Sequence, residues 1–336
     1  MARTLLVLGT LLAVMLGWAY RVAHPPVEAP GAGEVTLWEI PPRDIVRVTG
    51  HTPRGTTTLT PEWPARGDTP AVWVQVQPAP SKGELAGRTP PAPPANTFRG
   101  NNQAVSALLA LASPRASRRI GALRDLDPAE FGFPGDSGYV LVERAEPGTP
   151  IRLELGDLFV GKSQRYVHTP AEGLVFLVPE AAFRPFVLPA QRLMERRLLP
   201  FPPGEAARVD LRQGSRSASL WRLPGAEGEA PRWAARPDAA DGEESARAFI
   251  EALPRVTVAE YLPPEQPLPP GTDVLEVRLF REAGTGAGTA PDAWVRFREA
   301  QGRTAAAVSS FTERPVQVPA PLLKALLART TEVLNP

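Results

Sequence analysis

The chain contains no cysteine among its 336 residues. Without thiols it can form no disulfide framework, no thiolate metal site and no cysteine nucleophile, and it offers no cysteine for lipid attachment. Histidine is also scarce, because His24, His51 and His168 are the only three and their spacing matches no zinc site. The sequence therefore predicts no metal ligand.

Lysine and net charge are limited as well. Lysine occurs only at positions 82, 162 and 324, so almost all of the 37 basic residues are arginine. The formal net charge is +1, which gives no bulk electrostatic basis for binding nucleic acid. We attribute the arginine surplus, together with abundant alanine and proline, to genomic base composition. Hydrophobic residues make up 43% of the chain, enough for real cores, and the length predicts about two domains.

Only one run, Thr4 to Tyr20, could enter a bilayer. It has no charged residue and sits at the short end of the roughly 17–25 apolar residues that a spanning helix needs. Arg3 precedes it, and Trp18 and Tyr20 lie at its far end, where aromatic residues favour the interface. We therefore predict a single-pass membrane protein with the N-terminus in the cytoplasm and residues 21–336 outside it.

A cleaved signal peptide competes with the anchor. Residues 5–16 have the length of a signal-peptide core, and Gly17 and Ala19 form a small-x-small pattern that would allow cleavage after Ala19. Trp18 crowds that site, and Arg21 follows it as a flanking anchor charge would. The anchor is therefore the favoured reading, and a cytosolic protein with a buried N-terminal helix is a third.

The remaining pattern predicts an α+β fold. Each half runs through a hairpin, a Trp-bearing strand, a helix, a strand, further antiparallel strands and a closing helix. We expect two tandem, duplicated units of mostly antiparallel sheet, each with helices packed on one face. The predicted divisions are an anchor or signal peptide at 1–21, a Pro/Gly-rich spacer at 22–33, a first unit at 34–200 and a divergent second unit at 205–336.

Three helices are predicted with particular inner faces. Asn101 or Asn102 would cap the first, and the last would begin at Pro319. The expected inner faces are Val105, Leu108, Leu109 and Ala112 in the first helix, Ala246, Phe249, Ile250 and Leu253 in the second, and Leu322, Leu323, Leu326 and Leu327 in the last.

One motif matches a phosphate-binding loop in full: Gly156-Asp-Leu-Phe-Val-Gly161-Lys162-Ser163. That chemistry needs a strand, a glycine-rich loop and then a helix whose N-terminus faces the phosphates. Residues 164–168 are β-like instead, and the loop interior is bulky. The motif would also lie outside the cytoplasm, away from ATP. We therefore interpret it as a β-hairpin.

Other chemical motifs have simpler structural interpretations. Gly135-Asp136-Ser137-Gly138 resembles a serine-protease segment but lacks the partners of a triad, so we interpret it as a turn. Acid pairs that could serve a glycosidase are interpreted as acids at helix starts. Arginine clusters are interpreted as solvated faces, and strand tryptophans as core residues. The residues concerned are Asp125 and Asp127, Glu243 and Glu244, Arg118 and Arg119, Arg192, Arg196 and Arg197, and Trp63, Trp73, Trp221 and Trp233.

A set of motifs carries a family resemblance: Trp73, Asn101-Asn102, Val105, Leu108-Leu109, Leu126 to Phe133, Leu153 to Gly156, Arg165 to Val167 and Val175 to Val178. Together they resemble the bacterial domain-of-unknown-function family DUF4340, roughly over residues 45–200 and more weakly beyond. Phe133 replaces the usual leucine. The resemblance implies an envelope protein with one N-terminal anchor, of a kind often encoded beside ABC-2 type transporters and gliding-type auxiliary proteins. It implies no catalytic residues.

We therefore expect a non-catalytic, membrane-anchored extracytoplasmic accessory protein of an envelope ABC-type transport or export system, in contact with transporter or auxiliary subunits. A glycan- or cell-wall-binding module is the alternative, and it needs two tryptophans exposed in one groove. A carboxylate-dependent hydrolase is a third class, and it needs two facing acids with a perturbed pKa. We predict no catalytic, cofactor-binding or metal-binding residue and no nucleic-acid partner, and the sequence specifies no oligomeric state.

Overall fold

The computed structural model describes residues 34–65, 68–79, 96–133, 138–159, 161, 163–225, 231–263, 266, 268, 271–282, 290–301 and 303–335. The predicted anchor and spacer, residues 1–33, lie outside these ranges. Within them, no helix has the length and apolarity needed to cross a membrane.

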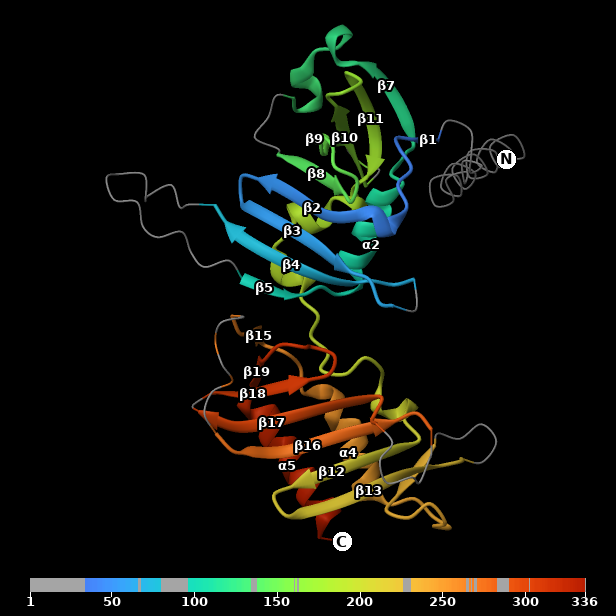
Figure 1. Ribbon diagram of the computed structural model, residues 1–336, viewed down its shortest axis with the longest axis vertical. Helices are drawn as coiled ribbons and strands as arrows, with labels where there is room; N and C mark the ends of the chain where they lie inside the picture. Colours follow the sequence, from blue (N-terminus) through green and yellow to red (C-terminus); the bar gives the residue numbers. More distant parts are fainter. Residues whose placement is uncertain are drawn as a thin grey trace, which may run out of the picture.

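The described residues form three antiparallel sheets with few helices, which confirms the predicted mostly antiparallel architecture. The first large sheet has nine strands in the order β5-β4-β3-β2-β8-β9-β10-β11-β7 (Figure 1). Its strands are β2 Ile45–Thr52, β3 Gly55–Glu62, β4 Ala71–Pro78, β5 Asn96–Arg99, β7 Arg118–Ala122, β8 Tyr139–Arg144, β9 Ile151–Phe159, β10 Gln164–Thr169 and β11 Leu174–Pro179. A small sheet pairs β1 Val35–Thr36 with β6 Arg115–Ala116.

Helix α2, Asn102–Ala112, packs against the first large sheet. Asn101 caps it as predicted, because its side chain accepts a hydrogen bond from the backbone N–H of Gln103 at 3.0 Å. Leu108 and Ala112 are buried as expected. Val105 and Leu109 are only half-buried, because the inner face is turned toward Ala104, Ala107 and Leu111.

Residues 180–193 form three short helical pieces, η4 Glu180–Ala182, α3 Arg184–Val187 and η5 Ala190–Leu193. Proline at 185 and 189 removes backbone donors there, which keeps each piece short. The other short 3-10 segments are η1 Pro42–Asp44, η2 Leu123–Asp125, η3 Pro128–Phe131, η6 Pro203–Glu205 and η7 Leu253–Arg255.

The second large sheet has eight strands in the order β14-β13-β12-β16-β17-β18-β19-β15. Helices α4, Glu244–Ala252, and α5, Ala320–Leu334, cover one of its faces and lie behind the strands in Figure 1. The predicted inner face of α4 is buried, and α5 buries Leu323 and Leu326. The strands are β12 Arg208–Gln213, β13 Arg216–Leu223, β14 Arg232–Ala234, β15 Glu260–Tyr261, β16 Asp273–Phe280, β17 Ala293–Gln301, β18 Thr304–Ser309 and β19 Val316–Pro319.

The two large sheets share one strand order. Read from β4 in the first sheet and from β14 in the second, each begins with one strand beside a hairpin: β4 beside β3 and β2, and β14 beside β13 and β12. Each then continues through four successive antiparallel strands and ends on a strand that precedes those four in the sequence. Strand β5 is the addition in the first sheet.

A junction of polar and aromatic contacts links the two sheets, and we define it as Arg99, Glu195, Tyr261, Phe311 and Glu313. The Arg99 guanidinium donates to the Phe311 carbonyl at 2.7 Å and to the Glu313 carboxylate at 3.0 Å. It also lies 4.4 Å from the centre of the Phe311 ring. The Tyr261 hydroxyl donates to the Glu195 carbonyl at 3.2 Å. Burial raises the pKa of Tyr261, which keeps this donor protonated.

Replacing Arg99 with alanine should destabilise the protein by about 2 kcal/mol, because two charge-assisted hydrogen bonds across the junction are lost. Chemical unfolding followed by tryptophan fluorescence measures this change. Limited proteolysis of the connection between the sheets, residues 194–207, should become faster. Arg47→Ala is the control, since Arg47 is exposed and pairs with Glu143 at 3.4 Å, and it should change stability by less than about 1 kcal/mol. Equal effects of the two substitutions would contradict a linking role for Arg99.

Candidate functional site

The phosphate-loop motif is a β-hairpin, as predicted. Gly156 to Phe159 form the end of β9, and β10 begins at Gln164, so a strand follows where a phosphate loop requires a helix. Gly161 and Ser163 have positive φ values of 86° and 48°, which is typical of a tight turn. The Arg165 side chain donates to the Gly156 carbonyl, so part of the supposed cradle is engaged within the sheet.

Gly156 is required for close packing. A Cβ atom placed there would overlap the Phe131 carbonyl oxygen and approach the Phe133 ring to 2.7 Å. This glycine therefore lets the segment around η3 lie against β9.

Gly156→Ala should lower the free energy of unfolding by about 1–3 kcal/mol, because the added methyl group overlaps backbone that cannot easily shift. Gly204→Ala is the control, since no heavy atom lies within 4 Å of its ideal Cβ position, and stability should stay level or rise slightly. Thermal unfolding of both variants measures the difference. A rise in the melting temperature of the wild type on adding ATP with magnesium would contradict the hairpin interpretation.

Two histidines that are far apart in the sequence lie in one cross-strand row of the first sheet. His51 pairs with Tyr139, Tyr139 with Glu154, and Glu154 with His168. His168 Nδ1 lies 3.0 Å from the Glu154 carboxylate, and the His51 and Tyr139 rings are 4.6 Å apart. No local sequence pattern indicates this row, because it depends on strand register. Of the predicted protease motif, Gly135 to Ser137 lie outside the described residues.

The predicted acids have structural partners. Asp127 caps η3 by accepting from the Ala129 N–H at 3.0 Å. Glu243 precedes α4 and accepts from the Ala235 N–H at 3.0 Å. Glu244 binds Arg247, whose hydrogen bonds and charge hold the pKa of that carboxyl below its ordinary value. Across the described part of the chain, no group of three His, Cys, Asp or Glu side chains could hold a metal ion.

The tryptophans and arginines singled out from sequence lie in several separate places. Trp73 and Trp233 are buried core residues, as predicted, while Trp63 and Trp221 are half-buried. Arg118 and Arg119 are exposed on the edge strand β7, in agreement with a solvated face. Arg197 instead binds Glu195 at 2.7 Å, and Arg196 donates to the Val258 carbonyl at 3.2 Å, so these two stabilise the connection between the sheets.

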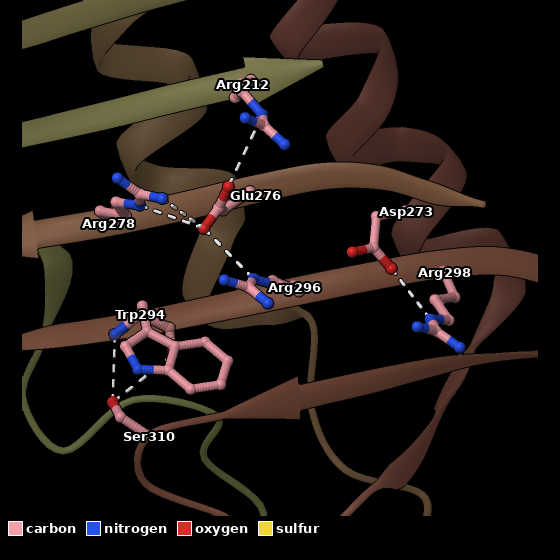
Figure 2. A network of polar contacts seen from close by, with 8 residues as sticks. All are labelled: Arg212, Asp273, Glu276, Arg278, Trp294, Arg296, Arg298 and Ser310. Atoms are coloured by element: carbon pink, nitrogen blue, oxygen red, sulfur yellow. Dashed lines mark hydrogen bonds and ion pairs between the residues drawn. The ribbon is translucent and has the colours of Figure 1, made fainter. Parts of the chain in front are cut away.

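A different set of arginines converges on the face of the second sheet opposite α4 and α5. We call these arginines, together with two carboxylates between them, the arginine face (Figure 2). The arginines are Arg212 on β12, Arg278 on β16, and Arg296 and Arg298 on β17, and the carboxylates are Asp273 and Glu276 on β16. Its residues alternate with the buried Leu275, Val277, Val295 and Phe297, which point into the core.

Glu276 lies at the centre of the arginine face. Its Oε1 accepts from Arg278 at 3.0 and 3.1 Å and from Arg296 at 3.2 Å, and Arg212 pairs with Oε2 at 3.6 Å (Figure 2). The Glu276 side chain is 8% exposed, whereas those of Arg278 and Arg212 are 46% and 67% exposed. Burial raises the pKa of Glu276, but hydrogen bonds and charge from Arg278 and Arg296 outweigh it, so its pKa lies below the ordinary value.

The surroundings of this network are suited to binding. Arg296 lies 5.1 Å from the centre of the half-buried Trp294 ring, and Arg298 binds Asp273 at 2.9 Å. A hollow of about 390 Å³ lies beside Glu276, lined by Arg212, Asp273, Arg298 and two glycines, Gly214 and Gly271. The lowered pKa of Glu276 keeps its carboxylate ionised, and Asp273 is paired with Arg298, so the arrangement can hold an anionic group beside the remaining guanidinium groups.

Sequence reasoning missed the arginine face. Its members come from three strands, and only the register places Arg212 opposite Glu276 and Glu276 opposite Arg296. One sequence pattern could have indicated it, because charged residues two apart on a strand lie on the same face. Glu276 and Arg278 have this spacing, and so do Arg296 and Arg298.

Glu276→Gln should lower stability at neutral pH by about 1 kcal/mol, because three guanidinium groups lose their carboxylate. The pKa of Glu276 is lowered in the folded protein, so its ionised form stabilises the fold above the ordinary value of 4.5, and this contribution is lost as the pH falls through the lowered pKa. Between about pH 5 and pH 3 the wild type should therefore lose more stability than the variant. Urea unfolding at several pH values measures this.

Glu143→Gln is the matched control, since Glu143 belongs to an exposed pair with Arg47. It should change stability by less than about 1 kcal/mol at neutral pH. Parallel pH profiles for the wild type and Glu276→Gln would show that Glu276 contributes no ionic stabilisation.

A comparison with protein families gives one match. The model of the family described as Domain of unknown function (DUF4340) matches residues 92–273, more than half of the chain. The match begins later and extends further into the second half than the resemblance read from the sequence. It includes Arg212 and Asp273 of the arginine face, while the other members lie beyond it. No curated protein and no solved structure matches the chain.

Proposed function

The chain belongs to the DUF4340 family of domains of unknown function, and from this premise we propose that it is a non-catalytic accessory protein of an envelope ABC-type transport or export system. It acts by contact with transporter or auxiliary subunits outside the cytoplasm. The observation that carries this proposal is the arginine face, a set of exposed guanidinium groups held in place on an open sheet face. Such a surface suits binding to another protein.

The proposal includes membrane attachment. Residues 4–20 anchor the chain in the inner membrane with its N-terminus in the cytoplasm, and residues 22–33 separate the anchor from the first sheet. This topology keeps the binding surface close to membrane-embedded subunits and raises its effective concentration beside them.

We also infer that the two large sheets are tandem repeats of one α+β unit. Their coincident strand orders support this, as does the occurrence of a helix, α2 or α4, after the first hairpin and the strand beside it in each. Each unit also bears a polar cluster on its central strands: the His51–His168 row in the first and the arginine face in the second. Duplication followed by divergence would account for two faces of different chemistry on one chain.

Crosslinking in intact cells tests the function. The tagged full-length chain is crosslinked in its host bacterium, solubilised gently and purified, and the associated proteins are identified by mass spectrometry. Subunits of an ABC-type transporter should be enriched. The control is Leu8→Arg/Leu12→Arg, which places two charges in the predicted anchor and should move the chain out of the membrane fraction and abolish the enrichment. Recovery of no transporter or auxiliary subunit with the wild type would overturn the proposal.

A further inference from the structure

We propose that the arginine face is the docking surface for an acidic segment of a partner protein, held by carboxylate side chains that bind Arg212, Arg278 and Arg296. This inference rests on the proposed function, because it assigns a chemistry to the partner contact. It commits to glutamate- or aspartate-rich protein and not to a lipid surface.

The charge balance of the face favours an anionic partner. Arg212, Arg278, Arg296 and Arg298 carry four positive charges, whereas Glu276 and Asp273 supply two negative charges. The face therefore has an excess of two positive charges, although the whole chain has a net charge of only +1. A local excess of one sign draws a partner of opposite sign and fixes its orientation.

The donors that would bind the partner are accessible. A guanidinium group has five N–H donors. Arg278 directs Nε and one terminal nitrogen toward Glu276, and Arg296 directs Nε toward it. The contact of Arg212 with Glu276 is an ion pair at 3.6 Å, and its side chain is 67% exposed. Terminal N–H groups thus face solvent beside one another, in the fork geometry that binds carboxylates in a bidentate manner.

Glu276 prepares the face for binding. Its nearly buried carboxylate holds Arg278 and Arg296 in place before any partner arrives, so less side-chain entropy is lost on association. The hollow of about 390 Å³ beside it, bordered by Arg212 and Arg298, offers room for a carboxylate side chain. Two glycines, Gly214 and Gly271, border this hollow with open space at their Cβ positions.

A protein partner fits the face better than a bilayer. Arginine beside a half-buried tryptophan, as in Arg296 and Trp294, is the composition found at the energetic centres of protein interfaces. A membrane-inserting surface needs exposed apolar side chains next to its basic residues. The exposed large hydrophobic residues in the described ranges all lie on other elements: Val35, Val46, Leu158 and Leu322.

Fluorescence anisotropy tests the proposal with the purified full chain in detergent. The probe is a fluorescein-labelled peptide of alternating glutamate and glycine, and a glutamine–glycine peptide of equal length is its neutral counterpart. The wild type should bind the acidic peptide and not the neutral one. Its affinity should fall as sodium chloride rises from about 50 to about 300 mM, because exposed charges are screened.

The matched variants are Arg212→Gln/Arg296→Gln on the face and Arg118→Gln/Arg119→Gln on strand β7. Both remove two positive charges, and the first leaves Arg278 bound to Glu276. The face variant should weaken binding about tenfold or more, whereas the β7 variant should change it less than about twofold. Thermal unfolding checks that each variant is folded. If the double face variant is unfolded, Arg212→Gln alone replaces it, with Arg118→Gln as its control and an expected loss of about threefold or more.

Three results would overturn the proposal. They are no binding of the acidic peptide by the wild type, equal losses in the two matched variants, and binding to phosphatidylglycerol vesicles without binding to the peptide. Failure here is distinguishable from failure of the proposed function. Transporter subunits recovered by crosslinking without peptide binding would reject only the arginine face as their contact. Peptide binding without recovery of transporter subunits would reject the transport role and retain the docking surface.

Discussion

Side-chain alternation along antiparallel strands is the constraint on which this structure depends. Helices pack on one face of each large sheet, and along the middle of β16 and β17 every second residue joins the core while the residues between them lie on the opposite face. In β16 and β17 this rule buries Leu275, Val277 and Val295 while bringing Glu276 and Arg296 together on the open face. A register shift of one residue would exchange the two sets, so the core and the candidate site are specified by the same pairing.

The arginine face illustrates how a nearly buried carboxylate can be retained. Taking Glu276 out of water is unfavourable, and the surrounding guanidinium groups offset that cost because they remain partly exposed and well hydrated. Such a cluster adds little to stability compared with an apolar core. The cluster instead holds several guanidinium groups at fixed positions, which suits a binding surface. The His168–Glu154 pair of the first sheet is a smaller polar contact of the same general kind.

The junction joins the two large sheets through contacts that cross between them. Arg99 ends the edge strand β5 of the first sheet, and Phe311 and Glu313 come from the loop between β18 and β19 of the second. Arg99 is thus far from Phe311 and Glu313 in the sequence and close to them in space. Tyr261 adds a buried hydrogen bond to the connecting segment. Together these contacts join two units that share a strand order but bear different open faces.

The sequence by itself determined the sheet-rich architecture, the buried face of α4 and the family. These features depend on local periodicity and short motifs, which a linear pattern records directly. It also excluded the phosphate-loop reading, because the residues after Ser163 are β-like. The rotated inner face of α2 was decided by packing around neighbouring elements. Only the tertiary structure decided the candidate site, since Arg212, Glu276 and Arg296 meet through strand pairing across long stretches of chain, and register has no local signature in the sequence.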